Sequence, residues 1–198
     1  SNKMQSSHLQ YYLYLSGLLD YENKQVTDAE IKLNLAKELL KETEGKYFYC
    51  KSVLDLMRVY SYQGNSEQIE NLFNELKENY YFNINNLLQA EAYLILGDIS
   101  KKPGSRLNEQ AIYYYSEALK YVEQSYIGEV TWQVLLGLGE EYLVKGAIGK
   151  GIELFKQANL IIEYIASKIK ENDNKNSYLA HPKRKRSLEK IEKVINHF

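Results

Sequence analysis

Apolar residues of alternating size recur along the chain in units of about forty residues. A first set of mostly small residues is spaced by 40, 40 and 42 residues and comprises Gly17, Met57, Gly97 and Gly139. A second set, spaced by 40, 42 and 40 residues, comprises Ala29, Ile69, Ala111 and Gly151. Four residues after each member of the second set comes a large apolar residue, and three residues later a mostly small one: Leu33, Phe73, Tyr115 and Phe155, then Ala36, Leu76, Ala118 and Ala158.

Steps of four and then three residues keep side chains on one face of an α-helix. Each unit is therefore expected to hold two helices, the first with a small residue near its middle and the second with a small–large–small face. Small residues let two helices approach closely. This accounts for glycine within a helix, although glycine there lowers the stability of the helix by about 1 kcal/mol. The pattern predicts an all-α fold, a solenoid of about four helical hairpins.

The same periodicity and the turn residues set the expected helix boundaries. Thr27 with Glu30 is a capping-box pattern, and Asn65 with Gln68 is a weaker one. Glycines at 64, 104 and 146 stand where helices are expected to end. The predicted helices span 8–22, 28–44, 46–62, 66–80, 85–101, 108–125, 128–145, 148–171 and 183–197.

The expected organisation is a flexible start, four units, a polar linker and a final helix. Residues 1–7 form the start; the opening Ser-Asn-Lys-Met suggests residues left by cloning before a piece of a longer protein. The units span about 8–45, 46–83, 84–127 and 128–171. Residues 172–182 form the linker, and 183–198 a capping helix whose apolar face comprises Leu188, Ile191, Val194 and Ile195.

Composition narrows the classes of function. Hydrophobic residues make up 44% and charged residues 26%, which is typical of a folded domain. The net charge of −1 gives no strong field for nucleic acid. No apolar run approaches the roughly 18 residues of a membrane span. The single cysteine, Cys50, excludes an internal disulfide and is expected in the core. The expectation is a cytoplasmic protein with no nucleic-acid or membrane partner.

Residues that commonly carry chemistry do not form a recognisable site. His8, His181 and His197 are far apart, and no cysteine or histidine lies near them at ligand spacing. No serine elbow or Cys–His arrangement stands out. The sequence therefore predicts no enzyme activity, no metal and no cofactor. The basic run 183–186 is expected to be a solvated helix start, although basic charge there opposes the helix macrodipole.

The fourth unit resembles the tetratricopeptide repeat family. It carries Leu138-Gly139, Tyr142, Gly146, Gly151, Phe155 and Ala158 at that family's spacing, with Glu163 where the closing proline stands. The third unit matches that spacing after a two-residue insertion near 102–104. The first unit matches it moderately well, and the second is degenerate. The resemblance covers about 10–165. The forty-residue period exceeds the usual 34, so HEAT-type repeats are the alternative fold.

Long repeats of this kind resemble two bacterial groups. One is the C-terminal repeat region of multidomain signalling proteins that join a kinase or cyclase to an ATPase module, whose ending is similar to residues 161–166 and 178–182 here. The other is the peptide-pheromone sensors of Gram-positive bacteria. The first resemblance implies a regulatory or docking region that binds a protein or peptide.

In such repeats the first helix of each unit lines a concave groove. The resemblance places these residues there: Tyr11, Tyr14, Tyr21, Lys51, Arg58, Glu91, Asp98, Gln133 and Glu140. Tyrosine offers a rigid contact surface with a polar tip, which suits peptide binding. Two alternatives stay open. The tyrosines can serve only to pack helices together, or exposed tyrosine patches can pair two chains into a homodimer.

Overall fold

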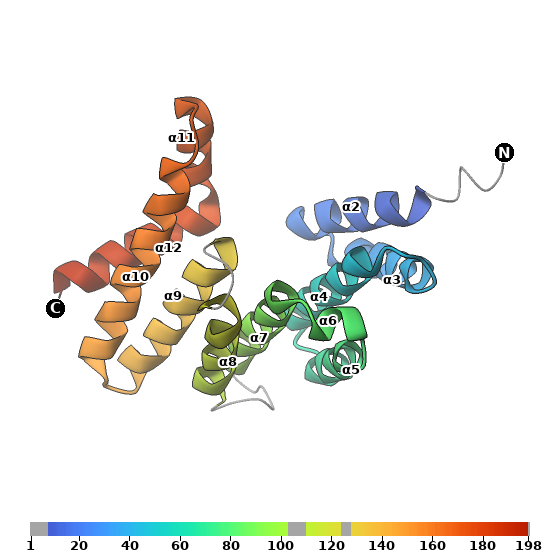
Figure 1. Ribbon diagram of the computed structural model, residues 1–198, viewed down its shortest axis with the longest axis horizontal. Helices are drawn as coiled ribbons and strands as arrows, with labels where there is room; N and C mark the ends of the chain where they lie inside the picture. Colours follow the sequence, from blue (N-terminus) through green and yellow to red (C-terminus); the bar gives the residue numbers. More distant parts are fainter. Residues whose placement is uncertain (1–7, 103–109, 124–127, 198) are drawn as a thin grey trace.

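The computed structural model describes residues 8–102, 110–123 and 128–197, and these form eleven α-helices and no strand (Figure 1). The predicted segment 1–7 and Gly104 lie outside the described residues. The helices are α2 (Leu9–Glu22), α3 (Val26–Lys41), α4 (Lys46–Gln63), α5 (Ser66–Lys77), α6 (Tyr80–Asn83), α7 (Asn86–Ser100), α8 (Ala111–Glu123), α9 (Glu129–Val144), α10 (Ile148–Ser167), α11 (Asn172–Ala180) and α12 (Pro182–His197).

Three local features differ from the sequence prediction. Helix α3 begins at Val26 after Gln25, so Thr27 lies inside its first turn and caps nothing. A short helix, α6, follows α5; its cap Asn79 accepts a hydrogen bond from the Phe82 backbone N–H at 3.1 Å. Residues 172–180, expected to be a polar linker, form α11. Asp173 in the first turn of α11 favours a helix there, because its negative charge opposes the positive end of the macrodipole.

Other predicted helix ends are confirmed. The Asn65 side chain caps α5 by accepting from the Gln68 backbone N–H at 3.2 Å. Gly64 and Gly146 have φ of 75° and 78°, the left-handed conformation that ends a helix and that glycine adopts without strain.

Helices that are neighbours in sequence pack as hairpins: α2 with α3, α4 with α5, α7 with α8, and α9 with α10. Helix α3 also packs on α4, and α8 on α9, which joins each of these hairpins to the one that follows it. The first helices of the hairpins form a continuous row, because α2 contacts α4, α4 contacts α7, and α7 contacts α9. We call α2, α4, α7 and α9 the inner row.

The predicted small–large contacts lie at the hairpin interfaces. A Cβ added to Gly17 would lie 2.9 Å from Leu33 Cγ, and one added to Gly139 would lie 2.8 Å from Phe155 Cδ2. In the second hairpin the fully buried Met57 stands where the others have glycine. Its large partner Phe73 is only half buried there.

The buried residues form two apolar clusters that meet at α7. The half-buried Tyr93 packs against both, with its ring 5.4 Å from Phe73 and 5.8 Å from Tyr121. Cys50 is fully buried in the first cluster, as predicted, and burial raises its pKa to about 11. Helix α12 packs on α10 through the buried Ile191. Within the described residues, no helix is long and apolar enough to cross a membrane.

Candidate functional site

Four of the predicted groove residues occupy equivalent turns of the inner row. Tyr11, Lys51, Glu91 and Gln133 are separated by 40, 40 and 42 residues and lie on α2, α4, α7 and α9. The structure connects two of them directly, because Lys51 Nζ and Glu91 Oε2 form an ion pair at 2.6 Å. The repeat period thus places opposite charges next to each other on adjacent helices.

The central polar cluster joins α2, α4 and α7. The Tyr14 hydroxyl donates to Asp55 Oδ2 at 3.0 Å. Arg58 forms an ion pair with Asp55, and its Nη2 lies 3.6 Å from Glu91 Oε2. Since Lys51 pairs with the same carboxylate, one connected network holds these five side chains. Most of the charge on this part of the inner row is therefore compensated within the protein.

Burial and neighbouring charges shift the pKa values of two groups in this cluster. Burial alone lowers the pKa of Arg58, but the carboxylates of Asp55 and Glu91 raise it by more, so it stays above its ordinary value. Burial raises the pKa of Tyr14, and Asp55 raises it further, so the phenol stays protonated. Arg58 thus remains a cation and Tyr14 a hydrogen-bond donor at any physiological pH.

The tyrosines at the start of the row pack mainly between helices. The rings of Tyr11 and Tyr14 lie 5.0 Å and 5.7 Å from that of Phe48 in edge-to-face geometry. Tyr14 is 4% exposed and offers almost no surface to a ligand. Tyr21 is half buried and lies within the electrostatic field of Arg58. Burial raises the pKa of Tyr21. Of the three predicted groove tyrosines, Tyr21 and Tyr11 keep accessible ring surface.

A second cluster joins α7 and α9. Asp98 accepts from the buried Tyr115 hydroxyl at 2.6 Å and lies 3.8 Å from Lys101 Nζ. Lys101 also pairs with Glu140 of α9 at 3.1 Å. The other oxygen of Glu140 receives Lys190 of α12 at 2.5 Å. The side chain of Asp98 is 52% exposed, which makes it the most accessible carboxylate of these two clusters.

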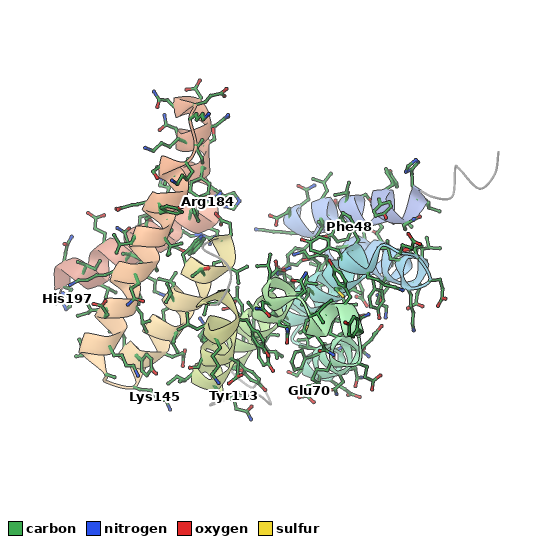
Figure 2. The ribbon with its side chains drawn as sticks, viewed as in Figure 1. Phe48, Glu70, Tyr113, Lys145, Arg184 and His197 are labelled. Atoms are coloured by element: carbon green, nitrogen blue, oxygen red, sulfur yellow. The ribbon has the colours of Figure 1, made fainter. Side chains whose placement is uncertain are left out.

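Helix α12 lies against the part of the inner row formed by α9. Lys183 donates to Gln133, and Arg184 Nη1 lies 3.3 Å from Glu129 Oε2. Arg184 also stacks on the Tyr178 ring, whose hydroxyl donates to Glu129 at 2.7 Å. Figure 2 shows Arg184 where α12 meets α9, and Phe48 beside α2. Lys183 and Arg184 belong to the basic run that was predicted to be solvated, and both bind side chains of α9. These contacts offset the unfavourable position of two cations at the start of a helix.

A small hollow of about 100 Å³ remains between α7, α9 and α12. Its lining includes Asp98, Lys101, Gln133, Glu140 and Lys183. Much of Lys183 is exposed as a residue, yet its ammonium reaches inward, and burial of that end lowers its pKa.

Several elements converge on that ammonium. Asp98 and Glu129 raise the pKa of Lys183, whereas Arg58 lowers it. Glu22, at the end of α2, raises it as well. Of these groups, Asp98 of α7 also lines the hollow together with Lys183.

Sequence reasoning missed Asp55, Glu129 and the contribution of α12. Asp55 lies on α4 and accepts from Tyr14 of α2, at a position that belongs to none of the periodic sets. Glu129 stands at the first turn of α9, before the repeat motif begins. The spacing of Lys183, Arg184 and Lys190 does not show that these side chains contact the inner row. That contact depends on the direction that α11 gives to the chain before α12 begins.

Within the described residues, no group of three or more His, Cys, Asp or Glu side chains is placed to hold a metal ion. The chain matches no protein-family model, and no curated protein shows significant similarity to it. The geometry of the inner row is therefore the basis for a functional proposal.

Proposed function

We propose that this chain is a protein- or peptide-binding scaffold that uses the inner row, the regulatory or docking part of a larger bacterial signalling protein. The hollow between α7, α9 and α12, where polar side chains of all three helices meet around Lys183, carries this proposal. A surface that gathers donors and acceptors from separate elements can contact an extended segment at several points. We further propose that the four hairpins are tetratricopeptide-like units in a superhelix, supported by the continuous row of first helices.

The contact between α12 and α9 supports binding of another segment. Lys183, Arg184 and Lys190 bind Gln133, Glu129 and Glu140 along α9. This arrangement is a helix docked through side-chain contacts on the inner row, in the manner proposed for an external ligand. It also confines an external ligand to α4 and α7, next to the hollow.

The accessible groups describe the chemistry of the ligand. Asp98 offers an exposed carboxylate, and Arg58 and Lys101 keep about a third of their side chains exposed, at 32% and 28%. Both signs of charge lie side by side, so a peptide with interspersed basic and acidic residues fits better than a polyanion. We propose a cytoplasmic protein or peptide partner, with no catalysis by this chain.

A peptide library displayed on phage, selected against the chain, tests this proposal. Fluorescence titration of the selected peptides should show weaker binding to Asp98→Asn and to Lys101→Ala, by about fivefold or more, because each change removes a charged contact. The amide oxygen introduced by Asp98→Asn can still accept from the Tyr115 hydroxyl, so the fold is kept.

Glu153→Gln, on the exposed side of α10, is the matched control and should bind as the unchanged chain does. Failure to select any peptide would contradict the proposal. Peptides equally sensitive to all three substitutions would contradict it as well.

A further inference from the structure

A cavity of about 600 Å³ lies where the third hairpin meets the fourth, between the end of α7, the start of α8 and the end of α9. Residues of α10 and α12 complete its lining. The apolar part of that lining consists of Ala111, Ile112, Leu143, Val144 and Phe155. Ligand pockets in proteins commonly measure roughly 300–1,000 Å³ and are lined mainly by apolar side chains. The junction of these two hairpins therefore has room for a large apolar group.

The two earlier junctions between hairpins carry a hydrogen bond that spans them. Between the first and second hairpins, Gln63 at the end of α4 donates to Glu30 Oε2 of α3 at 2.7 Å. Between the second and third hairpins, Lys102 Nζ, just after α7, donates to Ser61 Oγ of α4 at 2.9 Å. At both junctions a polar side chain thus bridges the space between neighbouring hairpins.

The repeat period replaces one member of the first bridge with an apolar residue at the third junction. Ile112 stands at the position equivalent to Glu30, and Lys145 at the position equivalent to Gln63. Isoleucine has no side-chain acceptor, so this pair cannot form the bridge. Both Ile112 and Lys145 line the cavity instead.

The second bridge is lost in the same way. Val144 stands at the position equivalent to Lys102, and Lys101 at the position equivalent to Ser61. Valine cannot donate a side-chain hydrogen bond, and Val144 is 80% exposed at the edge of the cavity. The third junction is therefore apolar and open at the positions where the earlier junctions are polar and bridged.

The cavity adjoins the hollow of the proposed peptide site. Lys101 and Glu140 line both spaces, and their ion pair measures 3.1 Å. Lys190 pairs with the other oxygen of Glu140 at 2.5 Å. Because the charged groups at this rim are paired with one another, they do not select a charged group for the cavity.

We propose that this cavity anchors one large apolar side chain, above all an aromatic one, of the peptide that binds the inner row. The inference rests on the proposed function and specifies its ligand. Charged residues of the peptide would contact Asp98 and Lys101, and an apolar residue close to them in sequence would enter the cavity. Aromatic side chains that fill a pocket supply much of the binding energy of an interface, and polar contacts around them fix the orientation.

A titration that needs no peptide tests the cavity by itself. N-acetyl-tryptophanamide carries the proposed anchor side chain alone, and it is added to the chain with isotopically labelled methyl groups. The methyl signals of Ile112, Leu143 and Val144 should shift in nuclear magnetic resonance spectra. The methyl signals of Ile31, which is 54% exposed on α3, should not.

Substitutions in the peptide and at the cavity test the anchor. Replacing the large apolar residue of a selected peptide with alanine should weaken binding by about tenfold or more. Ile112→Glu should weaken the binding of the unchanged peptide by about fivefold or more, because the new carboxylate can pair with Lys145 and close the cavity. Val144→Lys should act in the same direction, at an exposed position where the fold tolerates the change. Ile31→Glu is the matched control and should bind as the unchanged chain does.

The outcomes separate this inference from the proposed function. Peptides that Asp98→Asn weakens, but that Ile112→Glu and Val144→Lys leave unaffected, would overturn the anchor and keep the inner-row site. Selected peptides without a large apolar residue would do the same. Absence of the methyl shifts with the tryptophan amide would also contradict the anchor. Methyl shifts without any selected peptide would contradict both proposals and assign the cavity to a small molecule.

Discussion

At the scale of single residues, two glycines hold one aromatic ring between helices. A Cβ at Gly97 would lie 2.6 Å from Tyr115 Cε1, and a Cβ at Gly137 would lie 2.5 Å from Tyr115 Cζ. The fully buried Tyr115 ring therefore sits against both α7 and α9. This contact joins the third hairpin to the fourth and places the Tyr115 hydroxyl at Asp98.

Gly97→Ala is expected to destabilise the fold, although alanine is the better helix former. The added methyl group meets a ring that is enclosed on all sides, which costs about 1–3 kcal/mol. Gly149→Ala is the control, because nothing lies within 4 Å of a Cβ there and α10 should gain about 0.5–1 kcal/mol. Urea unfolding measures both, and equal effects of the two changes would contradict the tight contact.

The sequence locates these contacts only in part. Gly97 lies on the forty-residue period, so its role is predictable, whereas Gly137 lies off that period and is visible only in the structure. The groove positions show a similar limit. Periodicity assigns Tyr14 and Glu91 to the inner row, but it does not report that both are buried in a hydrogen bond and an ion pair.

At the scale of elements, the capping predictions can be compared directly. Asn65 caps α5, whereas Thr27 lies within α3 without a capping bond. Both stand in similar sequence patterns, with a polar residue three positions before Gln68 or Glu30. What decides between them is where the preceding turn ends, since Gln25 adopts the cap conformation one residue before Val26 starts the helix.

Asn65→Ala should therefore lower the free energy of unfolding by about 1 kcal/mol, because the Gln68 N–H loses its acceptor. Thr27→Ala, the paired control, should leave stability unchanged or raise it slightly, since alanine favours a helix interior. Thermal denaturation of the two variants distinguishes these outcomes. A larger loss for Thr27→Ala than for Asn65→Ala would show that the box pattern governs α3 after all.

Helix α11 shows why periodicity fails for short polar elements. Its nine residues carry only Tyr178 and Leu179 as large apolar side chains, too few to show a helical period. Both are half buried and pack on the second apolar cluster. Tertiary contact therefore stabilises a helix that local pattern alone assigns to a linker.

At the scale of the whole molecule, buried tyrosines make stability depend on alkaline pH. Burial raises the pKa of Tyr14, Tyr49, Tyr115 and Tyr178, and that of Tyr93 to about 12. An unfolded tyrosine titrates near pH 10. Because the folded pKa is raised, the contribution of each is fully present below about pH 10. It is lost as pH rises further, since the unfolded chain then releases protons that the folded chain keeps.

The free energy of unfolding should accordingly fall with pH above about 10. In Tyr115→Phe the fall should be shallower by up to about 1.4 kcal/mol per pH unit, because one titrating phenol is gone. Tyr80→Phe, at a position that is 78% exposed, is the comparison and should keep the original slope. Denaturant melts at successive pH values give these slopes, and an unchanged slope in Tyr115→Phe would contradict the assignment.

The burial of Cys50 has a practical consequence for studying the molecule by fluorescence. Thiols react with maleimide dyes as thiolates, so a fully buried thiol with a raised pKa is inert in the folded chain at neutral pH. Cysteines introduced at the exposed positions 22 and 185 would then be the reactive ones, one at the end of α2 and one in the first turn of α12. Energy transfer between dyes at these positions would report the distance between the end of α2 and the start of α12, and its change when a peptide binds, without removal of the native cysteine.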